Sequence, residues 1–240
     1  MIKKVFVLNV LLLSMFLVAC TQDHQQGDKP VKAPRGFRSE GIIKAAIAIR
    51  AVKLVDTEPA VPDDIEVKSN IVYKQVDSIS LQLDIYRQKQ LKEAAPVLIF
   101  IHGGGWSKGK RADYLAYLLD EAQKGYVTVT VSYRLSGVAH FPAAVEDVEN
   151  AVQWIREHSS EHMINPEKIA LVGGSAGGHL AMMVGFGDHL PGGKVQALVN
   201  LYGPTDLTTA YARNRGECLN FLGESYQENP GLYTAASPRT

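Results

Sequence analysis

A serine surrounded by glycines is the feature of this sequence best suited to chemistry. Residues 171–179 read LVGGSAGGH, in which Gly173, Ser175 and Gly177 fit the pattern G-x-S-x-G. An apolar run precedes the serine and a helix-forming stretch follows it, which is the context of a nucleophile elbow. Such a turn holds the serine in a sparsely populated backbone conformation, so its neighbours must be small. We expect the Ser175 hydroxyl to stand at a helix N-terminus, where the helix dipole favours developing negative charge.

A second glycine cluster follows the apolar run 97–101. It consists of His102, Gly103, Gly104, Gly105 and Trp106. Glycines free the backbone to aim N–H groups into a cleft, and with the N–H of Ala176 these groups would hold the oxyanion of a tetrahedral intermediate. Each such donor typically lowers the barrier by about 3 kcal/mol. Strand-glycine-helix turns also occur in nucleotide-binding folds, but GGSAGG lacks the order G-x-G-x-x-G. Together the two clusters favour acyl transfer.

The elements that must position these residues alternate along the chain. Residues 70–87 alternate in polarity and predict an antiparallel pair with a turn near Asp77 and Ser78. Continuous apolar runs predict strands buried on both faces at 97–101, 126–134, 168–174 and 195–203. Helices are expected at 111–124, from Pro142 onward, and from Ser175 to Val184. This order predicts an α/β fold with a mostly parallel sheet and helices on both faces.

Composition excludes some function classes. The 240 residues carry 25 basic and 25 acidic side chains, and 46% are hydrophobic. The balance gives no basic stripe for nucleic acid and no charged tail. No metal or organic cofactor is implied. Cys218 would lack an intramolecular partner if Cys20 is modified, and we interpret it as a core thiol.

The first residues are typical of a targeting segment. MIKK is followed by an apolar stretch too short for a comfortable spanning helix, which predicts a secretory signal at 1–19. LVAC, at 17–20, resembles the bacterial lipobox, and that resemblance implies a lipid on Cys20; the alternative is an ordinary signal peptide. We expect a tether at 20–38, an amphipathic helix within 40–55 and a hydrolase domain over 39–240. The protein is then exported and membrane-anchored, at the outer membrane or cell surface.

The motifs HGGGW, FPAAVEDVENAVQWI and NPEKIALVGGSAGGHLA carry a family resemblance. From about residue 65 the chain resembles the α/β-hydrolase fold, and within it the carboxylesterase and acetylxylan/feruloyl esterase-like families and the hormone-sensitive-lipase-type esterases. The resemblance implies that Ser175 is the nucleophile and that Gly104, Gly105 and Ala176 supply oxyanion N–H groups. It implies that His102 braces its loop and that Asp147 is structural. Gly174 stands where many relatives carry Asp or Glu.

The rest of the catalytic triad is not apparent. In this fold an Asp or Glu and then a His follow the serine, and the sequence printed stops at Thr240 before the expected positions. His140, His179 and Asp206 are poor substitutes, since His179 lies one helical turn after Ser175 and Asp206 one strand too early. We therefore expect a C-terminally truncated hydrolase with impaired activity and an exposed apolar edge at 195–201.

These observations predict a serine esterase acting on small acyl esters. By resemblance the substrates include acetyl or feruloyl esters of carbohydrate. Residues 204–236, with Tyr211, Phe221 and Tyr226, would shape the pocket or simply pack in the core. The alternatives are a peptidase of the prolyl-oligopeptidase type, against which HGGGW argues, and a non-catalytic surface lipoprotein that reuses the fold.

Overall fold

The computed structural model describes residues 56, 58–187 and 194–238. The signal at 1–19, the lipidation site Cys20, the tether at 20–38 and the helix within 40–55 lie outside the described residues, so they stay predictions. No helix in the described ranges combines the length and apolarity needed to cross a membrane.

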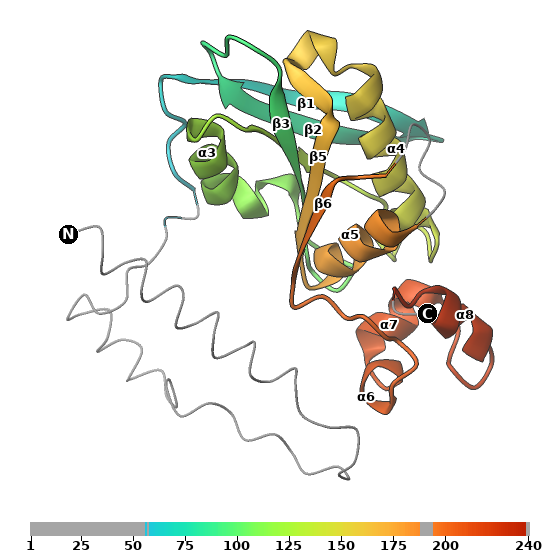
Figure 1. The fold of residues 1–240 in the computed structure, drawn as a ribbon. Coiled ribbons are helices and arrows are strands. Elements are labelled where there is room, and N and C mark those ends of the chain that lie inside the picture. Colours follow the sequence, from blue (N-terminus) through green and yellow to red (C-terminus); the bar gives the residue numbers. More distant parts are fainter. Residues whose placement is uncertain (1–55, 57, 188–193, 239–240) are drawn as a thin grey trace, which may run out of the picture. The chain divides into compact units, whose positions relative to one another are not determined.

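A six-stranded mixed sheet forms the centre of the described fold (Figure 1), in the order β1-β2-β4-β3-β5-β6. β1 pairs antiparallel with β2 and β2 antiparallel with β4, whereas β4, β3, β5 and β6 run parallel. The carboxyl ends of β3, β5 and β6 therefore meet at one edge. The strands are β1 Ile65–Val76, β2 Ile79–Gln88, β3 Ala95–Ile101, β4 Val127–Val131, β5 Ile164–Gly174 and β6 Ala197–Leu201.

Helices cover both faces of the sheet, with α3 on one face and α4 and α5 on the other (Figure 1). Pro142 occupies the N-cap of α4, as the sequence predicts, because proline needs no donor at a helix start. The helices are η2 Arg111–Tyr114, α3 Leu115–Gln123, α4 Ala143–Glu157, η3 Ser160–His162, α5 Ala176–Phe186, α6 Ala210–Arg213, α7 Gly216–Leu222 and α8 Pro230–Ala235.

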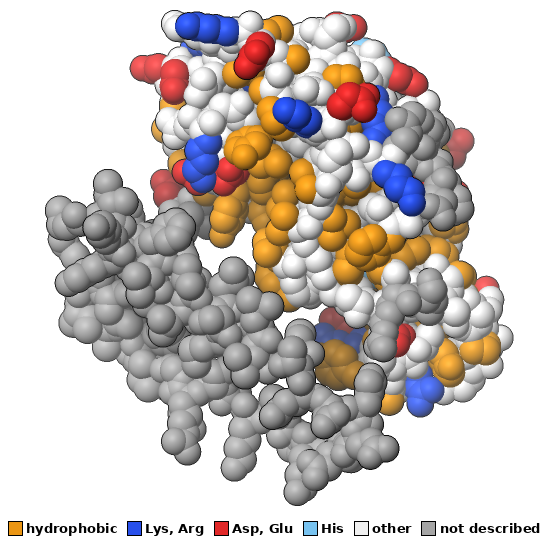
Figure 2. Space-filling view, viewed as in Figure 1, with side chains coloured by type: hydrophobic (Ala, Val, Ile, Leu, Met, Phe, Trp, Pro, Cys, Tyr) orange, Lys and Arg blue, Asp and Glu red, His pale blue; other side chains and the backbone are white. Residues whose placement is uncertain are grey.

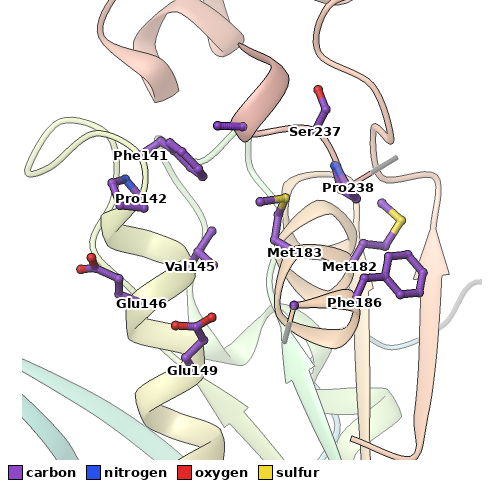
Figure 3. A pocket seen from close by; sticks show the side chains of 12 residues that line it. Phe141, Pro142, Val145, Glu146, Glu149, Met182, Met183, Phe186, Ser237 and Pro238 are labelled. Carbon is purple, nitrogen blue, oxygen red and sulfur yellow. The ribbon is translucent and has the colours of Figure 1, made fainter. Parts of the chain in front are cut away.

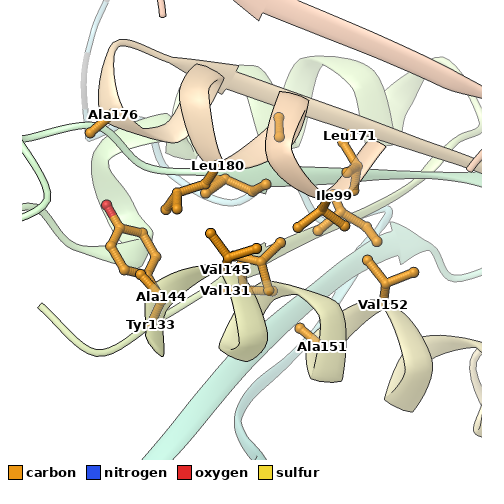
Figure 4. Close-up of a cluster of buried hydrophobic side chains, with 14 of the residues drawn as sticks. Ile99, Val131, Tyr133, Ala144, Val145, Ala151, Val152, Leu171, Ala176 and Leu180 are labelled. Atoms are coloured by element: carbon orange, nitrogen blue, oxygen red, sulfur yellow. The ribbon is translucent and has the colours of Figure 1, made fainter. Parts of the chain in front are cut away.

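The side chains of β3 point alternately to the two faces of the sheet and contribute to a hydrophobic cluster on each face. Ile99 and Ile101 pack with α4 and α5 in the larger hydrophobic cluster, part of which is drawn in Figure 4. Leu98 and Phe100 face α3 in the smaller cluster. Successive side chains of a strand point to opposite faces, so an unbroken apolar run is required where both faces are covered.

The strand predictions hold with two differences at the ends. The turn at Asp77 and Ser78 is confirmed, and β1 begins at Ile65, ahead of the alternating stretch 70–87. Burial on both faces is confirmed for β4 but is wrong for β6, whose Val199 is 44% exposed. Among the described strands, β6 lies at the edge of the sheet, so its apolar side chains have neighbours on one side only. Figure 2 shows hydrophobic side chains gathered on one face of the molecule.

Candidate active site

Ser175 lies between β5 and α5 in a strained backbone conformation. Its φ is 54° and its ψ is −123°, and it occupies the N-cap of α5. Positive φ is unfavourable for any residue with a Cβ atom. The Ser175 N–H donates to the Leu201 carbonyl at 2.9 Å, which ties the turn to the end of β6. The residue is half-buried, so it is open to solvent.

The glycines on either side of Ser175 are required by backbone packing. A Cβ on Gly173 would collide with the backbone of Gly177. A Cβ on Gly177 would collide with the carbonyl oxygens of Ile101 and His102, at the end of β3. G-x-S-x-G therefore lets the first turn of α5 sit directly against the strand that leads into the other glycine cluster.

The glycine loop after β3 lies beside Ser175. The position that a Cβ would take on Gly103 is 3.5 Å from Ser175 Cβ and 2.8 Å from the Gly174 carbonyl oxygen. Gly104 and Gly105 have φ of 110° and 59°, values that favour glycine. The structure thus brings together the two motifs that the sequence singled out. Their roles in holding an oxyanion stay predictions.

His102 is engaged with its own loop. Its ring stacks on Tyr133 with centroids 4.4 Å apart, and its Nδ1 lies 2.9 Å from the Gly103 carbonyl oxygen. The Tyr133 hydroxyl donates to the His102 carbonyl at 2.9 Å. Burial lowers the pKa of His102. These contacts fit the bracing role that the resemblance implies.

Trp106 connects the glycine loop to α5 and α7. Its ring stacks on Phe221 with centroids 4.5 Å apart, and its Nε1 donates to His179 Nδ1 at 3.3 Å. His179 Nε2 donates to the Ala236 carbonyl at 2.8 Å. Burial lowers the pKa of His179 to about 4, so the ring is neutral and structural. Phe221 is 1% exposed, which favours the core-packing interpretation of that residue.

The substitutes considered for the triad are occupied elsewhere. His140 Nδ1 donates to the Asn220 carbonyl at 2.9 Å. Asp206 accepts from the backbone N–H and the hydroxyl of Thr208, at 2.9 and 2.6 Å. In the described ranges no imidazole is hydrogen-bonded to the Ser175 hydroxyl.

Asp147 forms a buried ion-pair network away from the serine. It is fully buried on α4, and Arg134 donates to it from Nε at 2.7 Å and from the backbone N–H at 3.0 Å. Lys74 of β1 donates to the same carboxylate at 3.0 Å. The network joins β1, the segment after β4 and α4, as expected for a structural residue.

Two tyrosines beside the serine escaped the sequence reasoning. The Tyr114 and Tyr202 hydroxyls lie 2.5 and 3.0 Å from the position that a Cβ would take on Gly174. They come from η2 and from the turn after β6, 88 residues apart in the chain, and they lie 60 and 28 residues from Gly174. Tyr114 lies within the predicted helix 111–124 and Tyr202 within the predicted strand 195–203, so neither carried a sequence signal that pointed to the site.

Metal-ligating groups and cavities were the other candidates for a binding site among the described residues. No group of three or more His, Cys, Asp or Glu side chains among the described residues is arranged to hold a metal ion. A cavity of about 440 Å³ lies between α4 and α5 (Figure 3), lined by Phe141, Met183 and Phe186 with Glu146 and Glu149 on one wall. Ser175 is not among its lining residues.

Comparison with known proteins gives consistent matches. The family model described as BD-FAE matches residues 83–240. The esterase LipQ of Mycobacterium tuberculosis is 35% identical over 174 residues, which cover 65% of this chain and 41% of LipQ. The chain thus spans less than half the length of the curated relatives it matches.

Solved structures similar to this chain include an esterase and a bifunctional protein. Thermogutta terrifontis esterase 2 phosphorylated by paraoxon is 29% identical, with a TM-score of 0.57, covering 75% of this chain and 66% of that one. A bifunctional GH43-CE protein of Bacteroides eggerthii is 25% identical with a TM-score of 0.63, covering 72% of this chain and 28% of that one.

Proposed function

This chain belongs to the BD-FAE family and has the α/β-hydrolase fold, and from that membership we propose that it is a carboxylic ester hydrolase whose nucleophile is Ser175. The observation that carries the proposal is the apposition of the strained serine turn and the glycine loop, with Gly103 packed against Gly174 and Ser175. The names of the esterase relatives support the same reaction class.

In the proposed reaction the Ser175 oxygen attacks the ester carbonyl carbon. The carbonyl oxygen becomes an oxyanion held by the N–H groups of Gly104, Gly105 and Ala176. Collapse of the tetrahedral intermediate breaks the bond to the alcohol oxygen, which leaves with the proton taken from Ser175. Water then attacks the acyl-serine and releases the acid.

This sequence of steps needs a base for the serine proton, because a neutral hydroxyl is a weak nucleophile. Each histidine ring among the described residues is bonded elsewhere: His102, His140 and His158 to carbonyl oxygens, His162 to Lys68, and His179 to Trp106 and Ala236. We therefore propose that the 240-residue chain hydrolyses esters slowly. The oxyanion donors alone can leave residual catalysis, as in hydrolases stripped of triad members.

Added imidazole provides the test, because it can act as a base for the Ser175 proton. Hydrolysis of p-nitrophenyl acetate is measured with and without imidazole, using the Ser175→Ala variant in the same buffer to subtract catalysis by imidazole itself. We expect imidazole to accelerate the parent chain at least about tenfold more than the variant. This is less than the roughly 100-fold gain or more from a positioned base, because imidazole in solution is not held beside the serine. Equal acceleration of the two proteins would reject Ser175 as the nucleophile.

The same observation about the histidines favours a second candidate, a non-catalytic surface protein that retains the fold. It predicts that the parent and Ser175→Ala chains behave identically at every imidazole concentration, while both still bind esters. The imidazole experiment therefore separates the two candidates directly.

We propose small acyl esters of carbohydrate, acetyl or feruloyl, as the substrates. The support is the resemblance of the HGGGW and GGSAGG motifs to acetylxylan and feruloyl esterases. Release of acetate from acetylated xylan, compared with release of ferulate from methyl ferulate in the presence of imidazole, distinguishes the two acyl groups.

We also propose export and lipid anchoring through Cys20, on the strength of the sequence LVAC at 17–20. In a bacterial host, the parent chain should incorporate labelled fatty acid and sediment with membranes. Cys20→Ser should abolish the label, and label retained by that variant would exclude this cysteine as the acceptor.

A further inference from the structure

Tyr202 has an unusual backbone for an exposed aromatic residue. Its φ is 52°, a value that bulky residues rarely adopt, and its side chain is 78% exposed. Trp106 and Ser175 also have positive φ, and they follow β3 and β5 as Tyr202 follows β6. Conformations of this kind persist where the surrounding structure enforces them, often at functional sites. We call the region at the carboxyl ends of β3, β5 and β6 the carboxyl edge. Tyr202 is thus the third non-glycine residue with positive φ at this edge.

The Asn200 side chain holds Tyr202 in this conformation. Asn200 Oδ1 accepts from the Gly203 N–H at 2.8 Å, which closes a tight turn around Tyr202. A Cβ on Gly203 would lie 2.6 Å from the His179 backbone nitrogen, so the turn is packed against the first turn of α5. The strained residue is therefore fixed to the helix that begins at Ser175.

The turn directs the Tyr202 hydroxyl to the same place as the Tyr114 hydroxyl. Both oxygens lie within 3.0 Å of the point above Gly174 where a side chain would begin, one residue from Ser175. Tyr114 is held by its ring contact with Phe100, at 5.6 Å between centroids. Glycine at position 174 leaves room for both hydroxyls, because a Cβ there would lie 2.5 Å from the Tyr114 hydroxyl oxygen.

These two groups have the chemistry of a recognition surface. Burial raises the pKa of Tyr114 to about 12, so its hydroxyl keeps its proton at neutral pH and can donate. The exposed Tyr202 ring offers an apolar face beside its own hydroxyl. A ligand that covered these hydroxyls without a polar partner would lose their hydration, which costs free energy.

We propose that Tyr114 and Tyr202 are specificity-determining residues of the Ser175 site, which select esters bearing a hydroxyl group next to the ester bond. The inference rests on the proposed function for the location of the ester. It adds the two residues that discriminate among esters and the group that they recognise.

Binding to the Ser175→Ala chain tests this proposal without requiring catalysis. The probes are 2-hydroxycyclohexyl acetate and cyclohexyl acetate, which differ by one hydroxyl, titrated by ligand-observed NMR. We expect the hydroxyl-bearing ester to bind about tenfold tighter, the ratio that corresponds to roughly 1.4 kcal/mol. Adding Tyr114→Phe and Tyr202→Phe together should bring the ratio close to one, because the two hydroxyls that discriminate between the probes are then gone.

Tyr126→Phe is the matched control, because Tyr126 is partly exposed at the opposite end of the sheet, just before β4. It should leave the ratio unchanged. A ratio near one in the Ser175→Ala chain, or a preference that survives both substitutions, would overturn the proposal. If the preference is found but imidazole acceleration is not, the roles of Tyr114 and Tyr202 in ester recognition are supported and the assignment of Ser175 as the nucleophile is rejected.

Discussion

Positive φ angles fall on different residue types in the hairpin and at the carboxyl edge, and Met163, just before β5, is the remaining described non-glycine residue with such an angle. In the hairpin of β1 and β2 they fall on Asn70 and Asp77. At the carboxyl edge they fall on Trp106, Ser175 and Tyr202. Asn and Asp tolerate this conformation because their short polar side chains can hydrogen-bond locally, whereas the other three gain no such compensation.

The stabilising interactions are divided in the same way. The hairpin side is held by ion pairs: Arg111 with Asp84, and the Asp147 network through Lys74. The carboxyl edge is held by close backbone packing of glycines and by aromatic stacking of Trp106 on Phe221. The difference indicates that the hairpin side maintains the fold, while the edge keeps strain in place where a ligand would bind.

The largest expected effect comes from filling the glycine contact at the edge. Gly177→Ala places a methyl group against two backbone carbonyls that cannot move independently, and we expect a loss of about 3 kcal/mol or more in the free energy of unfolding. Urea denaturation measures the loss. Gly216→Ala is the control, since nothing lies within 4 Å of its Cβ position, and it should change stability by less than about 1 kcal/mol. Similar effects from both substitutions would show that close backbone packing does not require glycine at position 177.

Breaking the ion-pair network tests the hairpin side. Asp147→Asn leaves Arg134 and Lys74 without their buried carboxylate, and we expect about 3 kcal/mol of destabilisation. Glu146→Gln is matched, because Glu146 also pairs with Arg134 but is 53% exposed in its side chain, and it should cost less than about 1 kcal/mol. A comparable loss in the two variants would mean that burial does not determine the strength of this network.

The neutral His179 predicts a dependence of stability on pH. Its folded pKa of about 4 lies below the ordinary value of 6.5, so the unfolded chain binds a proton that the folded chain does not. The stability contribution is therefore present above pH 6.5 and is lost as the pH falls toward 4, by about 2 kcal/mol at pH 5. Urea unfolding at pH 7 and pH 5 should show a smaller loss for His179→Gln than for the parent. Equal losses would contradict a buried neutral ring.

The smallest expected effect measures the strain itself. Ser175→Gly relieves the positive φ and should raise the free energy of unfolding by about 1 kcal/mol. Ser175→Ala keeps the Cβ and should not raise it. The comparison of the two variants isolates the backbone term, and a glycine variant no more stable than the alanine variant would show that the turn stores no strain.

The sequence predicted the elements that depend on local pattern. Continuous apolar runs located β3, β4 and β5 to within a few residues, because these strands are covered on both faces. The two glycine motifs were found because close backbone approach permits few residue types. Polar residues 165–168 concealed the early start of β5, where Ile164 pairs with Ala95.

Tyr202 was beyond local reasoning. The run 195–203 predicted a strand that included Tyr202. The strand ends at Leu201, because the Gly203 N–H donates a hydrogen bond to the Asn200 side-chain oxygen and closes a turn. The convergence of Tyr114 and Tyr202 on Gly174 depends on the parallel order of distant strands. A pattern within a short stretch of sequence does not indicate which distant strands are neighbours, and the strand order of the sheet supplies this.

Covalent trapping of Ser175 tests directly whether the carboxyl edge presents this hydroxyl as a nucleophile. The parent and Ser175→Ala chains are incubated with paraoxon and imidazole, digested and mapped by mass spectrometry. We expect a diethylphosphoryl group on Ser175 in the parent, with release of p-nitrophenolate, and no modification of the equivalent peptide in the variant. An unmodified Ser175, or modification of another residue at the same rate in both chains, would contradict it.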